Sequence, residues 1–152
     1  MTVRQVRYDA GKWGTGELWL RGERLLHHEL PRQGPGGADG DPAAAPFEAY
    51  FRGERVSFEE VELELDGSTA FAQALVDALR AVGYGETVTY AELAALAGRP
   101  GAQRAAGTFC ARNRFPLVLP CHRVVSAGGI GPYGSLGTDY KRRLLELEAA
   151  RV

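Results

Sequence analysis

The sequence predicts an α+β protein in two parts, a small N-terminal mixed α/β domain over residues 1–66 and a helical C-terminal domain over residues 67–152. Two observations support this division. The first third of the chain holds short runs with the composition and alternation of strands, whereas from Thr69 onward apolar residues recur at helical spacing. With 152 residues and 45% hydrophobic composition, the chain can bury a core in one domain or in two small ones.

The N-terminal part should contain two neighbouring strands, ELWL at 17–20 and RLLHHEL at 24–30, separated by a short turn. Residues 33–46 are rich in Gly, Pro and Ala, have little to bury, and are expected to form a mobile loop. A helical segment follows at 46–54. The alternation of apolar and acidic residues at 61–65 then predicts a strand with one face in solvent.

The C-terminal part should begin with a helix over about 69–83, where apolar residues recur at i, i+4 and i+8. Thr89 and Glu92 have the spacing of a capping box, which predicts the start of a second helix that ends at Gly98. A tight turn leads from there into a third helix at 102–112. This pair of helices has the dimensions of a helix-turn-helix.

Two further segments complete the C-terminal part. The apolar run at 115–119 should form a short buried strand that leads into Cys121. Residues 139–152 should form a closing helix. Its expected apolar side comprises Tyr140, Leu144, Leu145 and Leu147.

The helix at 102–112 carries small residues at Ala102, Ala105, Ala106 and Gly107, beside which Arg104 projects. Small side chains let a helix backbone approach another surface closely. The same pattern is equally typical of close packing inside a protein. This feature by itself therefore leaves both interpretations open.

Charge is distributed unevenly along a chain whose formal net charge is only −1. Residues 93–138 contain no Asp or Glu but five arginines, so one basic region lies on an otherwise acidic protein. Such a region suits a phosphate backbone, although a solvated arginine surface is the plain alternative. No apolar run is long enough to cross a bilayer and the N-terminus lacks a secretory signal, so we expect a cytoplasmic protein with no membrane partner.

Cysteine and histidine are scarce. Cys110, Cys121 and three histidines are too few for a disulfide framework or a CxxC-type metal site, so we expect no metal and no cofactor. His27 and His28 lie in a strand-like run, where they should be ordinary surface or half-buried residues.

Cys121 is the candidate nucleophile. A free thiol is only a few per cent thiolate at neutral pH, so a reactive cysteine needs a base or a positive charge nearby. His122 can act as that base, through a water if the two side chains of an extended segment point apart. Glu148 on the closing helix is the acid chosen to orient the imidazole. Cys110 lacks such neighbours and is expected to be inert packing.

The residues Pro120-Cys121-His122-Arg123-Val124 resemble the active-site signature of the O6-alkylguanine-DNA alkyltransferases. The resemblance covers about residues 47–148. It includes Tyr84-Gly85-Glu86-Thr87-Val88-Thr89-Tyr90, the pair Arg104-Ala105, Asn113 eight residues before the cysteine, and the Gly-rich tail through Tyr133. The sequence departs from the family pattern at Val76, Gly83, Gln103 and Arg114, which bears on packing and DNA affinity more than on chemistry.

The resemblance implies a DNA repair protein that flips O6-alkylguanine out of duplex DNA and transfers the alkyl group irreversibly to its own Cys121. It implies a ribonuclease-H-like N-terminal domain with an antiparallel sheet and a C-terminal domain with a winged helix-turn-helix. The partner would be double-stranded DNA, bound in the minor groove. We expect a monomer in solution, and the sequence leaves open whether copies assemble cooperatively on DNA.

Catalytic roles follow from the same resemblance. His122 and Glu148 would be the water-linked relay that deprotonates Cys121. Tyr90 would contact the flipped guanine and help to neutralise the leaving base, with assistance from Lys141. Asn113 would be the hinge between the DNA-binding helix and the active-site segment.

DNA contacts are implied for the helix at 102–112 and for the Gly-rich tail. Arg104 would enter the base stack in place of the guanine. The small side chains beside it suit the minor groove, which is only about 6 Å wide. The remaining expected substrate and DNA contacts are Ala102, Gln103, Ala105, Gly107, Arg123, the Val124 carbonyl, and the loop residues Tyr133, Gly134 and Ser135.

Three alternatives compete with this interpretation. A non-catalytic alkyltransferase-like protein would bind damaged guanine without transfer, but such proteins replace the acceptor cysteine. A winged-helix regulator or a thiol hydrolase would not explain why a Cys-His pair, an arginine-bearing small-residue helix and a Gly-rich loop occur together.

Overall fold

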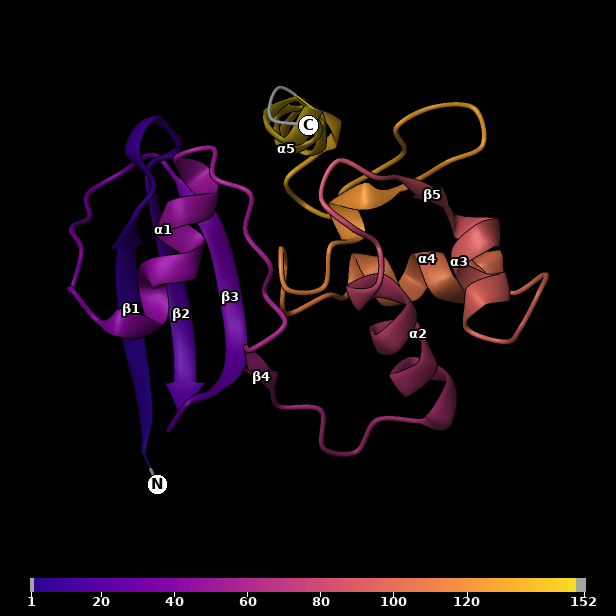
Figure 1. Ribbon diagram of the computed structural model, residues 1–152, viewed down its shortest axis with the longest axis horizontal. Coiled ribbons are helices and arrows are strands. Elements are labelled where there is room, and N and C mark those ends of the chain that lie inside the picture. The colour runs from indigo at the N-terminus through magenta and orange to yellow at the C-terminus, as the bar shows by residue number, and fades with distance from the viewer. Residues whose placement is uncertain (1, 150–152) are drawn as a thin grey trace. The chain divides into compact units, whose positions relative to one another are not determined.

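The computed structural model describes residues 2–149, which form two compact units (Figure 1). The first unit contains the chain up to Glu64 together with Arg114–Val118, and the second contains Leu65–Asn113 and the chain from Leu119 onward. The domain limits expected at residues 66 and 67 stay a prediction. No helix among the described residues is long and apolar enough to cross a membrane.

The first unit is built on a four-stranded sheet in the order β1-β2-β3-β4. Strands β1 (Val3–Asp9), β2 (Thr15–Arg21) and β3 (Arg24–Arg32) pair antiparallel, whereas the short β4 (Glu62–Leu63) pairs parallel to β3. The sheet is thus mixed rather than wholly antiparallel. A 3-10 helix at Gly11–Trp13 connects β1 to β2.

The core of the first unit lies between the sheet and α1 (Ala45–Phe51), which crosses one face of the sheet in Figure 1. Tyr8 and Leu18 from the sheet are fully buried. Phe47 and Tyr50 from the helix are at most 1% exposed. Aromatic rings dominate this interface, with the Tyr8 and Phe47 ring centroids 5.7 Å apart. Large buried rings compensate for the small size of the unit.

Two expectations for the first unit need correction. Strand β1 was not anticipated, because only Val6 and Tyr8 mark its buried side in the sequence. The expected loop at 33–46 also ends early, since Pro42–Ala44 form a 3-10 helix and α1 begins at Ala45. Asp41 explains this start, because its carboxylate accepts a hydrogen bond from Ala43 N and pairs with Arg4 at 2.9 Å.

The run at 115–119 is not the strand that its composition predicts. Leu117 adopts a φ of 75°, which is incompatible with an extended strand, although the side chains of Phe115, Leu117 and Leu119 are buried. His28 N instead donates to Arg114 O at 2.8 Å, which ties this segment to β3. The apolar composition of residues 115–119 thus predicted their burial correctly but not their backbone conformation.

His28 is 2% exposed rather than half-buried. Its Nδ1 lies 2.7 Å from Pro116 O and its Nε2 lies 2.6 Å from the Tyr8 hydroxyl. Because a carbonyl only accepts, Nδ1 carries the proton and Nε2 accepts from Tyr8. Burial lowers the pKa of His28 to about 3, against the opposing effect of the Pro116 carbonyl.

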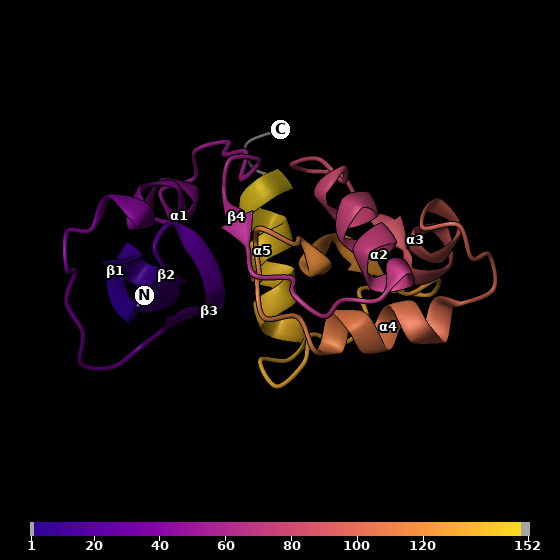
Figure 2. The same ribbon diagram turned by 90° about the horizontal axis from the view of Figure 1, so that it is seen from below.

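Helices dominate the second unit: α2 (Ala70–Arg80), α3 (Tyr90–Leu96), α4 (Gln103–Ala111) and α5 (Thr138–Ala149). Figure 2 shows α4 along one side of this unit, and α3 packs against both α2 and α4. The predicted capping box is confirmed, since Thr89 Oγ1 accepts from Glu92 N at 3.1 Å and Glu92 Oε1 accepts from Thr89 N at 2.9 Å. Two short strands, β5 (Val88–Thr89) and β6 (Val124–Val125), pair in parallel.

The closing helix α5 buries Leu144 as expected, but the rest of its buried face differs from the one predicted. Its fully buried residues are Lys141, Leu144 and Glu148, whereas Tyr140 and Leu147 are only half-buried. The expected end of this helix at residues 150–152 lies outside the described residues. Two charged side chains on a buried helix face must be matched by polar partners, and those partners form the candidate site.

Candidate active site

Cys121 lies in a buried turn of the second unit. Residues Cys121–Arg123 form a 3-10 helix in place of the expected extended segment, and Arg123 N bonds Pro120 O at 2.9 Å. Cys121 and His122 are 2% and 0% exposed. Pairing of β5 with β6 sets Thr89 opposite Val125, so Tyr90 at the start of α3 lies close to this turn.

Glu148 binds the imidazole of His122. Their Oε2 and Nε2 atoms are 2.5 Å apart, and both side chains are inaccessible to solvent. Gly85 N also donates to Glu148 Oε1 at 3.1 Å. With Nε2 donating to the carboxylate, Nδ1 is the ring nitrogen that can take up a proton.

Arg123 shares the same carboxylate. Its Nε and Nη2 donate to Glu148 at 2.9 and 3.1 Å, and its Nη1 donates to Val82 O at 2.7 Å. The guanidinium is therefore buried and engaged, which corrects the expectation that Arg123 contacts DNA. Nothing in the local sequence distinguishes an arginine that pairs inward from one that faces a phosphate.

These contacts shift the pKa values of both relay residues. Burial would raise the pKa of Glu148, but the hydrogen bonds and positive charges of His122 and Arg123 lower it far below its ordinary value. Burial lowers the pKa of His122, and Arg123 and Lys141 add to this effect, whereas Glu148 opposes it. The site thus pairs a carboxylate with a neutral imidazole, which is the state required of a general base.

The Cys121 thiol is protonated at rest. The hydrogen-bonded Cys110 side chain and burial raise the pKa of Cys121 well above its ordinary value, while Asn113 and Lys141 act in the opposite direction. A base must therefore accept the thiol proton when the sulfur reacts. Cys110 is a free, half-buried cysteine of α4, and its expected role as inert packing stays a prediction.

Asn113 connects α4 to the Cys121 turn. Its Nδ2 donates to Leu119 O at 2.9 Å, and Cys121 N in turn donates to Leu119 O at 2.7 Å. The Asn113 side chain also lowers the pKa of the Cys121 thiol, against the effect of burial. One amide therefore fixes the backbone before the cysteine and favours the thiolate.

Lys141 and two tyrosines interact electrostatically with the same thiol. Lys141 Nζ donates to Pro132 O at 3.1 Å and lies 5.6 Å from the Tyr90 ring centroid. Burial raises the pKa of Tyr90 to about 12, and the two thiols add to the shift. Burial also raises the pKa of Tyr133 well above its ordinary value, so both phenols stay protonated and can donate.

The loop that carries Tyr133 is anchored to the site through Lys141. Glycine is favoured at position 131, because the backbone φ there is 83° and a Cβ would meet Ser126 Oγ at 2.6 Å. Gly134 and Ser135 are exposed, whereas the Tyr133 hydroxyl is buried and has no hydrogen-bond partner among the described residues. A donor without a partner beside a thiol is suited to a polar substrate atom.

Most of the α4 residues that were expected to contact DNA lie on its solvent-facing surface. Gln103, Arg104 and Ala105 are exposed and Ala102 is half-buried. Ala106 is fully buried, and a Cβ on the half-buried Gly107 would lie 3.8 Å from the Tyr90 ring. The small residues therefore serve both interpretations, since some pack inward and others face solvent. Val124 is fully buried next to the Cys121 turn.

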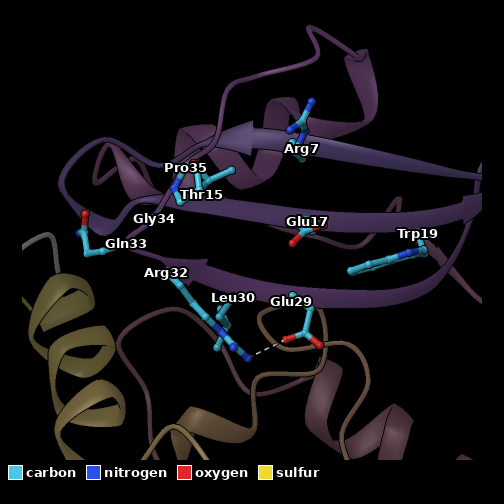
Figure 3. Close-up of a pocket in the computed structure, with 10 residues that line it drawn as sticks. All are labelled: Arg7, Thr15, Glu17, Trp19, Glu29, Leu30, Arg32, Gln33, Gly34 and Pro35. Carbon is cyan, nitrogen blue, oxygen red and sulfur yellow. Dashed lines mark hydrogen bonds and ion pairs between the residues drawn. The ribbon is translucent and has the colours of Figure 1, made fainter.

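No cluster suited to a metal ion occurs among residues 2–149. The first unit has a separate hollow of about 400 Å³ that includes none of the residues around Cys121 (Figure 3). Figure 3 shows Arg32 directed toward Glu29, and their charged groups are 3.3 Å apart. The two arginines that line this hollow are balanced by two glutamates. The hollow therefore has no excess positive charge that would attract a phosphate backbone.

Comparison with known proteins gives a family match over about half of the chain and a similar sequence over most of it. Residues 70–150 match the family described as 6-O-methylguanine DNA methyltransferase, DNA binding domain. A methylated-DNA–protein-cysteine methyltransferase of Mycobacterium bovis is 45% identical over 119 residues, which cover 78% of this chain and 69% of the relative.

Solved structures extend the similarity to nearly the whole chain. The O6-methylguanine methyltransferase of Mycobacterium tuberculosis superposes with a TM-score of 0.82 at 35% identity, covering 99% of this chain and 95% of that one. The same organism's OGT in complex with DNA gives a TM-score of 0.80 at 36% identity, covering 97% and 94% of the two chains. The mixed α/β architecture is therefore shared along both units.

Proposed function

The chain belongs to the methylated-DNA–protein-cysteine methyltransferase family, and from this premise we propose that it repairs O6-alkylguanine in DNA by moving the alkyl group onto Cys121. The observation that carries the assignment of Cys121 is the buried series Glu148, His122 and Cys121, in which a carboxylate holds a neutral imidazole beside a protonated thiol. A thioether product is not a leaving group, so each molecule reacts once.

The transfer begins with removal of the thiol proton. A water carries this proton from Cys121 to Nδ1 of His122, and Glu148 stabilises the imidazolium that forms. The thiolate then attacks the alkyl carbon as the bond from that carbon to O6 breaks. The electron pair of that bond stays with guanine, where a proton from the Tyr90 hydroxyl neutralises the developing negative charge.

Lys141 and the loop complete the pocket in this proposal. The ammonium of Lys141 favours both the thiolate and the departing guanine anion, because its charge lies among the reacting groups. The Tyr133 hydroxyl has no hydrogen-bond partner among residues 2–149 and can bond to the base. The Val124 carbonyl would accept from the guanine amine, and Gly134 and Ser135 would close over the ring.

DNA is proposed to meet the exposed side of α4. The helix pair α3 and α4 would form a winged helix-turn-helix whose second helix enters the minor groove, with Ala102, Gln103, Ala105 and Gly107 near the backbone. Arg104 is exposed on the first turn of α4, so it can occupy the space left by a flipped guanine. The first unit would be the ribonuclease-H-like domain of this family.

Intact-mass measurement tests the proposal directly. Mixing the protein with duplex DNA that carries one O6-methylguanine should add one methyl group per protein molecule, and peptide mapping should locate it on Cys121. Addition of more substrate DNA should add no second group. Tight binding to the damaged duplex with no change in mass would instead identify a damage-binding protein, and methylation elsewhere would overturn the assignment of Cys121.

A further inference from the structure

Five arginines give residues 93–138 their positive charge, and the structure divides them into two groups. Three of them have partners in the protein. The Arg99 guanidinium lies 4.6 Å from the Phe71 ring centroid. Arg114 donates to two backbone carbonyls at 3.2 and 3.0 Å, and Arg123 donates to the buried carboxylate of the candidate site. These three guanidinium groups are therefore held by other parts of the chain.

Arg104 and Arg112 form the second group, and both belong to α4, whose end is capped by Arg112. Each residue is exposed, and neither guanidinium has a hydrogen bond, ion pair or ring contact among residues 2–149. They are eight residues apart in the sequence. With 3.6 residues per turn and a rise of 1.5 Å per residue, they lie about 12 Å apart along the helix and only about 80° apart around it. The two free guanidinium groups thus share one side of α4.

The surface of α4 between the two arginines allows close approach of a partner. Ala105, Thr108 and Ala111 are exposed there, and all three are small. The Thr108 hydroxyl donates back to Arg104 O at 3.1 Å, so it lies along the helix instead of extending from it. Because residues 93–138 contain no Asp or Glu, no carboxylate of this segment repels an approaching anion.

We propose that Arg112 binds a backbone phosphate of the DNA and so fixes the far end of α4 on the duplex, while Arg104 acts at the base stack. This inference rests on the proposed function, which places α4 against DNA. A guanidinium can form two parallel hydrogen bonds to a charged phosphate, whereas minor-groove base edges offer neutral acceptors. One strand carries a phosphate for about every 3.4 Å of duplex axis. A duplex whose base stack meets Arg104 therefore presents phosphates within about 12 Å, the distance at which Arg112 lies.

The contact should add affinity without adding selectivity for damage. Phosphates are alike at every base pair, so Arg112 should strengthen binding to intact and damaged duplexes by the same factor. Each phosphate contact makes the association constant vary with salt concentration to a power of about −0.9. At about 0.1 M salt this dependence corresponds to a factor of roughly eight in Kd.

The test measures binding of the full-length protein to two fluorescent duplexes of one sequence, one intact and one with a single O6-methylguanine. All proteins carry Cys121→Ser, so that alkyl transfer does not consume the damaged duplex. Kd is measured by fluorescence anisotropy from about 50 to about 200 mM salt, and circular dichroism verifies folding. Arg112→Ala should weaken binding to both duplexes roughly eightfold at about 0.1 M salt and reduce the salt slope by about 0.9. Arg112→Lys should retain the slope, because it keeps the charge.

Arg142→Ala is the matched control, because Arg142 is an exposed arginine of the same unit that is paired with Asp139 at 2.8 Å. It should leave the slope unchanged. An unchanged slope in Arg112→Ala would overturn the proposal, and so would an equal change in Arg142→Ala, which would indicate an effect of net charge. Weakening confined to the damaged duplex would also overturn it, since Arg112 would then act at the lesion. If the slopes change as expected but wild type transfers no methyl group, the proposed repair is wrong and the phosphate contact is supported.

Discussion

Glu148→Gln should slow alkyl transfer by removing the charge that stabilises the His122 imidazolium. The substitution keeps the shape of the side chain, which is 0% exposed and lies 2.5 Å from His122 Nε2. An opposite charge at such a distance changes a pKa by about 1 to 3 units, and each unit corresponds to about 1.4 kcal/mol. The expected loss in the single-turnover rate at neutral pH is therefore roughly 10-fold to 1000-fold.

The pH dependence identifies the cause of this loss. Glu148 raises the pKa of His122, so Glu148→Gln makes the imidazole a weaker base toward the Cys121 thiol. Raising the pH ionises the thiol without help from His122, and much of the lost rate should then return. Rates measured from about pH 6 to about pH 10 should show a mutant profile displaced toward higher pH.

Two controls separate this effect from damage to the fold. Glu146→Gln removes an exposed carboxylate two residues away on α5 and should leave the profile in place. Glu148→Gln also leaves the buried Arg123 without its charged partner, so it should lower the free energy of unfolding by about 3 to 5 kcal/mol. Rates are therefore normalised to the folded fraction. If the pH–rate profiles of Glu148→Gln and wild type superimpose, Glu148 does not act on Cys121 through His122, and the proposed relay is wrong.

The remaining predictions concern the acceptor, the exposed arginine of α4 and the buried histidine of the first unit. Cys121→Ser should abolish transfer yet retain DNA binding by gel shift, whereas Cys110→Ser should still become methylated; equal loss in both would count against Cys121. Arg104→Ala should slow repair of duplex DNA much more than reaction with free O6-benzylguanine, and equal losses would assign Arg104 to structural support. Because the pKa of His28 is lowered to about 3, its neutral form stabilises the fold above about pH 6.5. That stability should decline by about 1.4 kcal/mol per pH unit as the pH falls toward 3, and urea titrations of His28→Gln should show a shallower decline.

Local features of the sequence determined much of the second unit. The capping box at Thr89 and Glu92 depends only on residues three apart, and the helix stripe after Thr69 depends on a period of 3.6 residues. Both are set by short-range geometry that any fold containing the helix must satisfy. His122 was likewise readable as the candidate base for Cys121, because the two residues are adjacent in the chain, and its role as that base stays a prediction.

Tertiary structure alone decided which polar groups share the site. Arg123 turns inward to Glu148 because α5 packs against the Cys121 turn. Asn113 bonds Leu119 O because the chain reverses between α4 and that turn. The burial of His28 depends in the same way on Pro116, which is 88 residues away in the sequence. Periodicity reports which face of a segment is buried, but the partner that a buried charge or thiol meets depends on contacts between distant segments. Those contacts exist only once the whole chain has folded.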